Sequence, residues 1–229
     1  MNGEKKTGLY TQVSHAGANP DSEFGSVSTP IYQTSTFKFQ NAEEGALRFS
    51  GEIPGYIYSR LGNPTTDTLE TAISDLEGGV GALATASGMA AVNLVYLTFL
   101  GAGSHITGTD ALYGSSRRII ELEYSRFGVE YDFIDTSNPG LLEKTLRPNT
   151  KLVYLETPAN PTLKLADIRR CAEIAHQAGA LVAVDNTFMS PVLQRPFELG
   201  ADIVIHSLTK YINGHTDVIG GMVVFKETK

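Results

Sequence analysis

The strongest constraint on how this chain of 229 residues folds is a regular alternation, from about residue 63 onward, of short apolar runs and helical patterns. The first helical pattern places Leu69, Ala72, Ile73 and Leu76 on one face and ends at a Gly-Gly pair. We predict strands at residues 80–85, 105–108, 129–134, 151–155, 181–184, 203–206 and 222–225. Further helices are predicted at residues 88–100, 115–127, 139–146 and 165–178. Strands that alternate with helices indicate an α/β fold, a mainly parallel sheet with helices on both faces.

Residues 1–60 differ from the rest of the chain. They are rich in Gly, Pro, Ser and aromatic residues and show little periodicity, as in SVSTPIYQTSTFKFQ. We expect them to form an arm that lies over a surface of this subunit or of another. Residues 61–229 are expected to form one domain.

Composition narrows the classes of function. The chain has 18 basic and 25 acidic residues, a formal net charge of -7, and no basic cluster beyond pairs such as Arg117-Arg118. Because nucleic-acid binding depends on concentrated positive charge, we expect no nucleic-acid partner. The single cysteine, Cys171, cannot form an intrachain disulfide, and the five histidines are scattered without metal-ligand spacing. No metal site is expected.

The sequence shows no membrane-targeting pattern. Its first residues, MNGEKKTGLYTQVSHAG, lack the apolar core of a signal peptide. Residues 78–109 contain no Asp, Glu, Lys or Arg, but glycines and polar residues interrupt them, so no apolar run of about 20 residues remains. We therefore expect a cytoplasmic protein without a membrane partner.

Polar residues follow several predicted strands, at the sheet edge where ligands of parallel sheets bind. Lys210 comes after the sixth strand, where partial burial lowers the pKa of an amine and makes it a nucleophile; a solvated surface lysine is the alternative. Asp185 ends the apolar run LVAV, where a buried carboxylate needs a partner such as a protonated pyridine nitrogen. A helix cap or a turn with Asn186 and Thr187 is the alternative for Asp185.

Other residues suit a flat ligand that carries a phosphate. Ser87-Gly88-Met89 lies between a strand and a helix, where N–H groups and the positive helix end hold anions; a plain tight turn is the alternative. Tyr113 follows a strand and suits stacking on a flat ring, with ordinary half-buried packing as the alternative.

Hydroxyl and guanidinium groups add donors for the same phosphate. Ser207 and Thr209 flank the end of the strand that leads to Lys210. Tyr58 and Arg60 lie in the arm, and Arg is the preferred donor to phosphate oxygens, although a surface salt bridge is the alternative. A lysine bonded to an aldehyde and an aspartate beside a pyridinium together form the minimal pyridoxal phosphate site. Nucleotide-binding motifs, Gly-x-Gly-x-x-Gly after the first strand or a P-loop, are absent.

Six ordered blocks of sequence carry a specific resemblance: GYIYSRLGNPTTDTLE, ATASGMAA, ALYGSS, ETPANPT, VDNTFMSP and HSLTKYINGHTDVIGG. Together they resemble the Cys/Met-metabolism family of pyridoxal phosphate enzymes, over residues 15–221. Within that family they are most similar to the γ-lyases that act on methionine or cystathionine. The resemblance implies pyridoxal 5′-phosphate as cofactor, the large domain of fold-type I enzymes for residues 61–229, and an amino acid as substrate.

The resemblance also implies a role for each candidate residue. Lys210 would bond to the cofactor's aldehyde and then shuttle protons, and Asp185 would keep the pyridine nitrogen protonated. Tyr113 would stack on the ring and assist departure of the γ-substituent, and Asn160 would lie near the 3-hydroxyl. The residues expected at the phosphate are Ser87, Gly88, Met89, Ser207 and Thr209.

Tyr58 and Arg60 would reach the phosphate from a neighbouring subunit, so the resemblance implies shared sites and a homotetramer built from dimers. The family's smaller C-terminal domain, with its arginine for the substrate carboxylate, is expected to be absent from a chain that stops at Lys229.

The activity implied by the resemblance is α,γ-elimination of L-methionine to 2-oxobutyrate, methanethiol and ammonia. Methionine γ-lyases carry Cys after the Tyr-Gly pair, whereas this chain has Ser115. Cystathionine γ-lyase, cystathionine γ-synthase and O-acylhomoserine sulfhydrylase activities therefore stay open as alternatives. A different class of function is also open. The chain could be a fragment that binds the cofactor, catalyses no reaction and serves in assembly or regulation.

Overall fold

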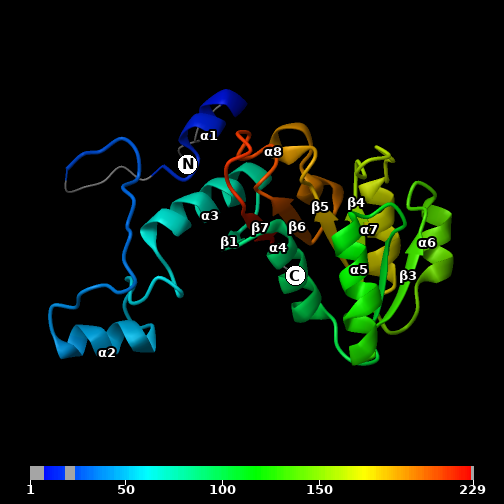
Figure 1. Cartoon of the computed structure of the whole chain (residues 1–229), viewed down its shortest axis with the longest axis horizontal. Helices are drawn as coiled ribbons and strands as arrows, with labels where there is room; N and C mark the ends of the chain where they lie inside the picture. The colour runs from blue at the N-terminus through cyan, green and yellow to red at the C-terminus, as the bar shows by residue number, and fades with distance from the viewer. Residues whose placement is uncertain (1–7, 19–23, 228–229) are drawn as a thin grey trace, which may run out of the picture. The chain divides into compact units, whose positions relative to one another are not determined.

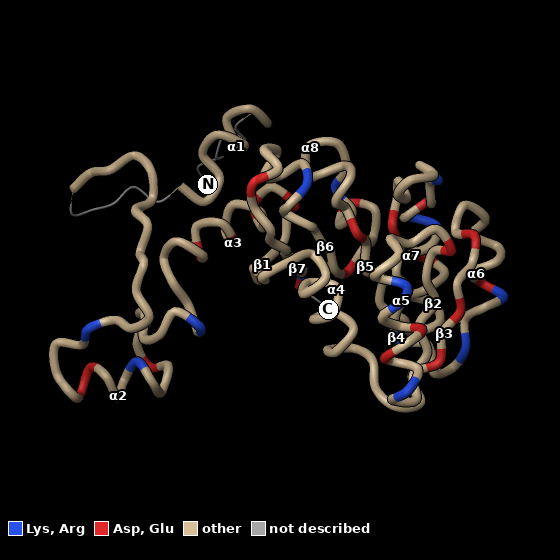
Figure 2. Tube along the Cα trace, in the orientation of Figure 1, with Lys and Arg blue, Asp and Glu red and all other residues tan. Residues whose placement is uncertain are grey.

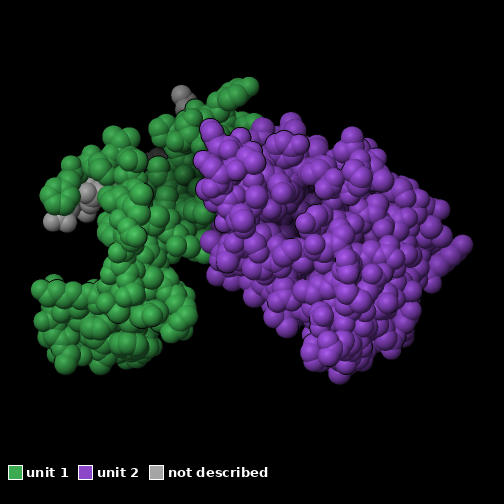
Figure 3. All heavy atoms as spheres, in the orientation of Figure 1, with its two compact units in different colours: residues 1–75 green, residues 76–229 purple. Residues whose placement is uncertain are grey.

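The computed structural model describes residues 8–18 and 24–227. It divides into two compact units, residues 1–75 and residues 76–229, which are coloured separately in Figure 3. The boundary falls inside helix α3 (Pro64–Glu77). Residues 1–7 and 19–23 of the expected arm lie outside the described residues, and the assignment of residues 1–60 as an arm stays a prediction.

The second unit is built on a seven-stranded sheet with the order β1-β7-β6-β5-β4-β2-β3 (Figure 1). The strands are β1 (Gly81–Thr85), β2 (His105–Thr109), β3 (Glu130–Ile134), β4 (Thr150–Glu156), β5 (Leu181–Asp185), β6 (Ile203–Ser207) and β7 (Gly221–Phe225). Neighbouring strands from β3 to β6 pair in parallel, as predicted. The prediction of a mainly parallel sheet is confirmed, and each predicted strand is present within two residues of its predicted ends.

Strand β7 departs from the parallel arrangement, because it runs antiparallel to both β1 and β6. Its first residue, Gly221, pairs with Thr85 at the end of β1 and with Ser207 at the end of β6. A Cβ atom at Gly221 would overlap the carbonyl oxygen of Ser87. The glycine therefore lets β7 approach the turn that leads out of β1, and it brings Ser87 and Ser207 to one sheet edge.

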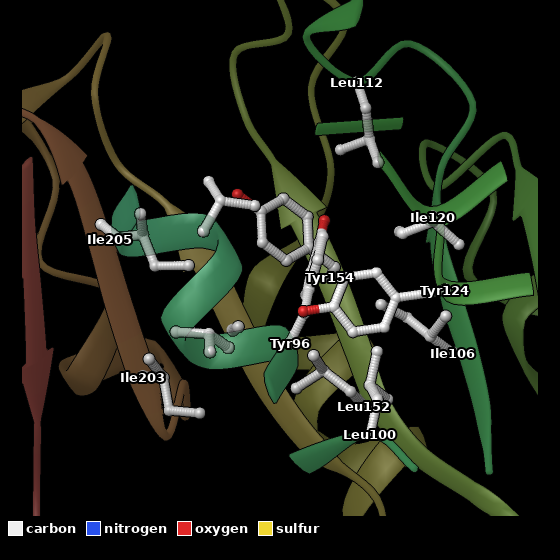
Figure 4. Packing of buried hydrophobic residues seen from close by; sticks show 14 of the residues in the cluster. Tyr96, Leu100, Ile106, Leu112, Ile120, Tyr124, Leu152, Tyr154, Ile203 and Ile205 are labelled. Carbon is white, nitrogen blue, oxygen red and sulfur yellow. The ribbon is translucent and has the colours of Figure 1, made fainter. Parts of the chain in front are cut away.

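Apolar cores lie on both faces of this sheet, because successive residues of a strand point to opposite faces. Leu152 and Tyr154 of β4 belong to one core, and Val153 and Leu155 belong to the other. In the first core the rings of Tyr96 and Tyr154 pack edge to face at 5.3 Å between centroids (Figure 4). All four β4 side chains are fully buried, as expected for the centre of a parallel sheet.

Helices cover both faces, as predicted. Those of the first core are α4 (Gly88–Phe99) and α5 (Gly114–Leu122), which a 3₁₀ turn, η1 (Tyr124–Phe127), follows. Those of the second core are α6 (Pro139–Thr145) and α7 (Ile168–Gln177). Two short elements, α8 (Ser190–Leu193) and η2 (Pro196–Leu199), lie between β5 and β6 and are not predicted by the sequence pattern.

Helix α7 begins three residues later than the predicted residue 165. Asp167 caps it, because its carboxylate accepts a hydrogen bond from Arg170 N at 3.0 Å. A side chain that satisfies one of the free N–H groups of the first turn fixes where a helix begins. The capping aspartate therefore sets the helix start, and the apolar periodicity upstream of it does not.

The first unit contains helices α1 (Leu9–His15) and α2 (Ala42–Ser50). The side chain of Asn41 accepts a hydrogen bond from Glu44 N, the Glu44 carboxylate accepts one from Gln40 N, and Gly51 ends α2 in a left-handed conformation. Asn followed three residues later by Glu, with Gly beyond, is a sequence signal for a short helix. The weak apolar periodicity of residues 1–60 does not reveal it.

Charged residues of the second unit are dispersed over its helices, strands and loops (Figure 2). Basic side chains frequently pair with acidic ones, as where Arg147 contacts both Glu130 and Asp132. Among the described residues, no helix has the length and apolar character needed to cross a bilayer.

Substituting Gly221→Ala tests the close approach of β7 to the end of β1. The added methyl group meets backbone that cannot move aside, so we expect a loss of about 1–3 kcal/mol in the free energy of unfolding. Gly101→Ala is the matched control, because a Cβ there meets no atom within 4 Å. Urea unfolding of the two variants measures the difference, and equal stabilities would contradict the packing described here.

Candidate active site

One pocket of about 270 Å³ opens at the carboxyl edge of the sheet. It collects every predicted site residue of the second unit: Ser87, Gly88, Met89, Tyr113, Asn160, Asp185, Ser207, Thr209 and Lys210. These residues lie at or just beyond the ends of β1, β2, β4, β5 and β6. Their convergence follows from topology, since strands that run in the same direction present their carboxyl ends at one edge.

The phosphate side of the predicted site is the start of α4. Ser87 caps this helix through its hydroxyl, which accepts a hydrogen bond from Ala90 N at 3.1 Å. The N–H groups of Gly88 and Met89 are among those that a helix leaves without an intrahelical acceptor. A Cβ at Gly88 would lie 2.7 Å from the Cβ of Ser207, so only glycine allows this approach. The helix start and the Ser207 hydroxyl therefore suit an anion together.

Lys210 lies three residues beyond β6, and its side chain is exposed to solvent within this chain. Its N–H donates a hydrogen bond to Ser207 O at 3.2 Å, and its carbonyl accepts one from Gly214 N at 2.8 Å. The partial burial expected for this amine is thus not found in the single chain. Nearby, the Thr209 hydroxyl accepts a hydrogen bond from Gly220 N at 3.1 Å, which anchors the loop before β7.

Asp185 ends β5 with its carboxylate in the pocket. One oxygen accepts a hydrogen bond from Thr187 N at 3.1 Å, and the other accepts one from the buried Tyr154 hydroxyl at 3.3 Å. Loss of hydration raises the pKa of this carboxyl above its usual value, while the hydrogen bonds from Thr187 oppose that rise. Among the described residues Asp185 has no salt-bridge partner, so its charge suits a cationic ligand group.

Glu156 ends β4 and lies directly across from Asp185 in the register of the two strands. Its side chain is 7% exposed, and burial together with the charge of Asp185 raises its pKa to about 7. Glu156 is not among the site residues predicted from the sequence, although a glutamate directly after a predicted apolar strand is a visible signal. The structure adds it to the pocket lining.

Tyr113 and Asn160 are both exposed at the rim of the pocket. The Tyr113 side chain is 48% exposed, and the residue lies immediately before α5. Asn160 lies four residues beyond the end of β4. An exposed ring and an exposed amide at a pocket rim are available to a ligand rather than to the core.

A buried polar network lies beside the ends of β5 and β6. The Glu77 carboxylate accepts hydrogen bonds from Asn186 Nδ2 at 2.8 Å and contacts His206 Nε2 at 2.6 Å. Gln194 donates to the side chain of Asn186 and to the carbonyl of Thr157. Because Asn186 follows Asp185 and His206 precedes Ser207, the network fixes the backbone that carries two pocket residues. The sequence pattern does not indicate this network.

Tyr58 and Arg60 belong to the first unit, where the Arg60 guanidinium lies 5.2 Å from the centroid of the Tyr58 ring. Their predicted contact with a cofactor phosphate in a neighbouring subunit stays a prediction. Among the residues that the structure describes, no cluster of three or more His, Cys, Asp or Glu side chains suits a metal ion.

The sheet edge combines a strand-end lysine, an aspartate without a cationic partner among the described residues, and a helix start that suits an anion, a combination typical of pyridoxal phosphate-binding proteins. The family model for the Cys/Met metabolism PLP-dependent enzymes matches residues 10–229. The chain belongs to this family, whose cofactor is pyridoxal phosphate.

Similar proteins carry several related names. The chain is 50% identical to the L-methionine gamma-lyase of Fusobacterium nucleatum subsp. polymorphum, over 96% of this chain and 56% of that protein. It is 47% identical to the cystathionine gamma-lyase of Bacillus subtilis, over 93% of this chain and 54% of that protein. The crystal structure of metB from Corynebacterium glutamicum superposes with a TM-score of 0.91 at 42% identity, over 97% of this chain and 56% of that one. The chain thus spans about half the length of these relatives.

The raised pKa of Glu156 predicts how stability depends on pH. Between the usual value of 4.5 and about 7, the folded carboxyl keeps its proton while the unfolded one releases it, so stability falls as pH rises. Because one pKa unit corresponds to about 1.4 kcal/mol, Glu156 accounts for a loss of about 3 kcal/mol between about pH 4.5 and pH 8.

Urea unfolding of the cofactor-free protein at several pH values measures this loss. We expect Glu156→Gln protein to lack that share of the pH dependence, because the amide does not titrate. Glu173→Gln, at an exposed surface ion pair, is the control and keeps the parent's dependence. Identical pH profiles for the parent and Glu156→Gln would contradict the buried carboxyl.

Proposed function

We propose that this protein is a pyridoxal phosphate-dependent lyase of sulfur amino acids. Its proposed reaction is α,γ-elimination, in which L-methionine and water give 2-oxobutyrate, methanethiol and ammonia. The observation that carries the proposal is the meeting, in one pocket, of the Lys210 amine, the Asp185 carboxylate and the start of α4. The 50% identity to an L-methionine gamma-lyase supports the choice of reaction.

The residues fit the cofactor group by group. Asp185, held by Tyr154 and Thr187, would accept the cofactor's protonated pyridine nitrogen, which would supply the cationic partner that its charge lacks among the described residues. The phosphate suits the N–H groups at the start of α4 and the Ser207 hydroxyl. These groups lie close together because Gly88 has no Cβ and lets Ser207 approach the helix start. Lys210 offers a solvent-exposed amine for the covalent bond to the aldehyde.

When bound, pyridoxal phosphate supplies an electron sink for negative charge that develops on the substrate's carbon atoms. Asp185 maintains that capacity, because a negative charge beside the pyridine nitrogen keeps the nitrogen protonated. With the cofactor bound, Lys210 would take the proton from Cα of the substrate, give that proton up, and, as a free amine again, act on Cβ as general base. The Tyr113 hydroxyl would protonate the departing sulfur at Cγ.

Cystathionine is the second candidate substrate. The departure at Ser115 from the cysteine of typical methionine γ-lyases favours it, and so does the 47% identity to a cystathionine gamma-lyase. Either substrate requires the same removal of protons from Cα and Cβ. The two substrates differ only in the second group on sulfur, which is a methyl group in methionine and a cysteine-derived group in cystathionine.

Borohydride reduction tests the role of Lys210. The cofactor-loaded full-length protein should absorb visible light, and reduction should fix the cofactor covalently to a peptide that contains Lys210. Lys210→Ala protein lacks the amine, so we expect no covalent adduct and at least about a 10³-fold loss of turnover. Lys226→Ala, a lysine outside the pocket, is the control. A covalent adduct that persists in Lys210→Ala would overturn the assignment.

Product analysis decides between substrates and reaction types. Elimination from methionine yields 2-oxobutyrate and methanethiol without any added thiol. A preference for cystathionine, with cysteine and 2-oxobutyrate as products, would select the second candidate. Absence of elimination, with turnover only when an activated homoserine ester and a thiol are both supplied, would replace the proposal with γ-replacement.

We also propose a cytoplasmic homotetramer whose dimers share their sites, with Tyr58 and Arg60 serving the neighbouring subunit. Hybrids of Arg60→Ala and Lys210→Ala subunits test this arrangement. If the two residues serve one site from different subunits, random mixing restores about a quarter of the parent's sites, because each hybrid dimer regains one intact site. Activity no higher than that of the separate variants would show that both residues act within one chain.

A further inference from the structure

We propose that Glu156 is a positioning residue, whose single carboxylate fixes the two chain segments that bring Tyr113 and Asn160 to the pocket. The identity of the groups that these two residues meet rests on the proposed function. The positioning itself rests on contacts within this chain.

The carboxylate bridges segments that are far apart in the sequence. Oε2 accepts a hydrogen bond from Tyr113 N at 2.6 Å, across 43 positions of the sequence. Oε1 accepts one from Asn160 N at 3.0 Å. Above about pH 7, where Glu156 is ionised, these hydrogen bonds are about twice as strong as bonds to a neutral acceptor. Each pocket-rim residue is thus held through its backbone, which leaves the Tyr113 ring and the Asn160 amide free for a ligand.

The local structure offers these two residues little other backbone support. Tyr113 lies at the N-cap position of α5, yet its side chain makes no capping hydrogen bond. Asn160 lies between two prolines of the loop, Pro158 and Pro161, which have no N–H of their own to donate. Two hydrogen bonds close the loop at Ala159, whose N–H donates to Lys164 O at 3.0 Å and whose carbonyl accepts from Leu163 N at 2.7 Å. Glu156 is therefore the group that connects this loop to the start of α5 inside the pocket.

A second link joins the same segments at the surface. Lys164 Nζ contacts the Asp110 carboxylate at 3.2 Å, and both side chains are about one-third exposed. Solvent-screened pairs of this kind contribute little stability. The buried link through Glu156 is the one that sets positions within the pocket.

The energetic cost of this carboxylate argues against a purely structural role. Glu156 is buried directly across from Asp185, so two acidic side chains share one edge of the sheet. A residue selected for stability alone would not place a second acid there. A carboxylate, however, offers two acceptor oxygens at a fixed separation, and neither an apolar side chain nor a glutamine offers this.

Glu156→Gln tests the inference with almost no change in shape. The amide keeps one acceptor, but its NH₂ group faces an N–H donor, so one of the two backbone hydrogen bonds must break. In the cofactor-free protein we expect amide hydrogen exchange at Tyr113 or Asn160 to accelerate at least about tenfold. Asp167→Asn is the matched control, because Asp167 also accepts a backbone hydrogen bond but lies outside the pocket. Unchanged exchange at both residues would overturn the inference.

The functional consequence is measured with pyridoxal phosphate itself. We expect Glu156→Gln to weaken its binding roughly tenfold and to change the ratio of its visible to near-ultraviolet absorbance, with Asp167→Asn equal to the parent. When the protein already carries Asn160→Ala, we expect Glu156→Gln to weaken cofactor binding by a smaller factor. The reason is that Glu156 acts on binding partly by positioning the Asn160 side chain. Unchanged affinity and absorbance, or additive effects, would overturn the inference.

The two proposals fail separately. A parent protein that binds no pyridoxal phosphate contradicts the proposed function, whereas the exchange rates in the cofactor-free protein still decide the positioning. A parent that binds the cofactor and a Glu156→Gln variant with unaltered exchange, affinity and absorbance contradict the positioning alone.

Discussion

Two carboxylates at the ends of neighbouring parallel strands impose the constraint that organises the rest of this edge of the sheet. Glu156 and Asp185 lie directly across from each other, and burial raises the pKa of both. A buried charge is tolerated only where donors or an opposite charge meet it. Two backbone N–H groups meet Glu156, and donors from Thr187 and Tyr154 meet Asp185. Among the described residues Asp185 has no salt-bridge partner, so it favours a cationic ligand.

Support for these carboxylates comes from both faces of the sheet. Tyr154 belongs to the core beneath α4 and donates its hydroxyl to Asp185. The buried pair of Glu77 and His206 holds the ends of β5 and β6 through Asn186. Gly221 then draws β7 against the turn before α4. These contacts fix the backbone at the ends of β5 and β6, whereas the Tyr113 side chain at the pocket is exposed.

The sequence predicts the α/β fold, the strands and the family well, because alternating apolar runs and the polar residues after them are local signals. The antiparallel direction of β7 is not a local property, since it depends on pairing with β1 and β6. Glu77 escapes prediction for the same reason, because its partners Asn186 and His206 are distant in sequence. Glu156 has a local signal at its strand end, but its hydrogen bond from Tyr113 N spans 43 positions and is not a local property. Helix α2 has a local signal in its capping residues Asn41 and Glu44, but the apolar periodicity of this segment is too weak to indicate a helix. The roles of the pocket residues stay predictions.

The central claim is that Asp185 keeps a bound pyridine nitrogen protonated. Nitrogen-15 NMR of the protein loaded with pyridoxal phosphate labelled at the ring nitrogen tests it most directly. We predict the chemical shift of a pyridinium at neutral pH in the parent, and the shift of a neutral pyridine in Asp185→Asn, whose amide cannot stabilise the positive charge. A neutral pyridine in the parent, or a pyridinium in both proteins, would contradict the account.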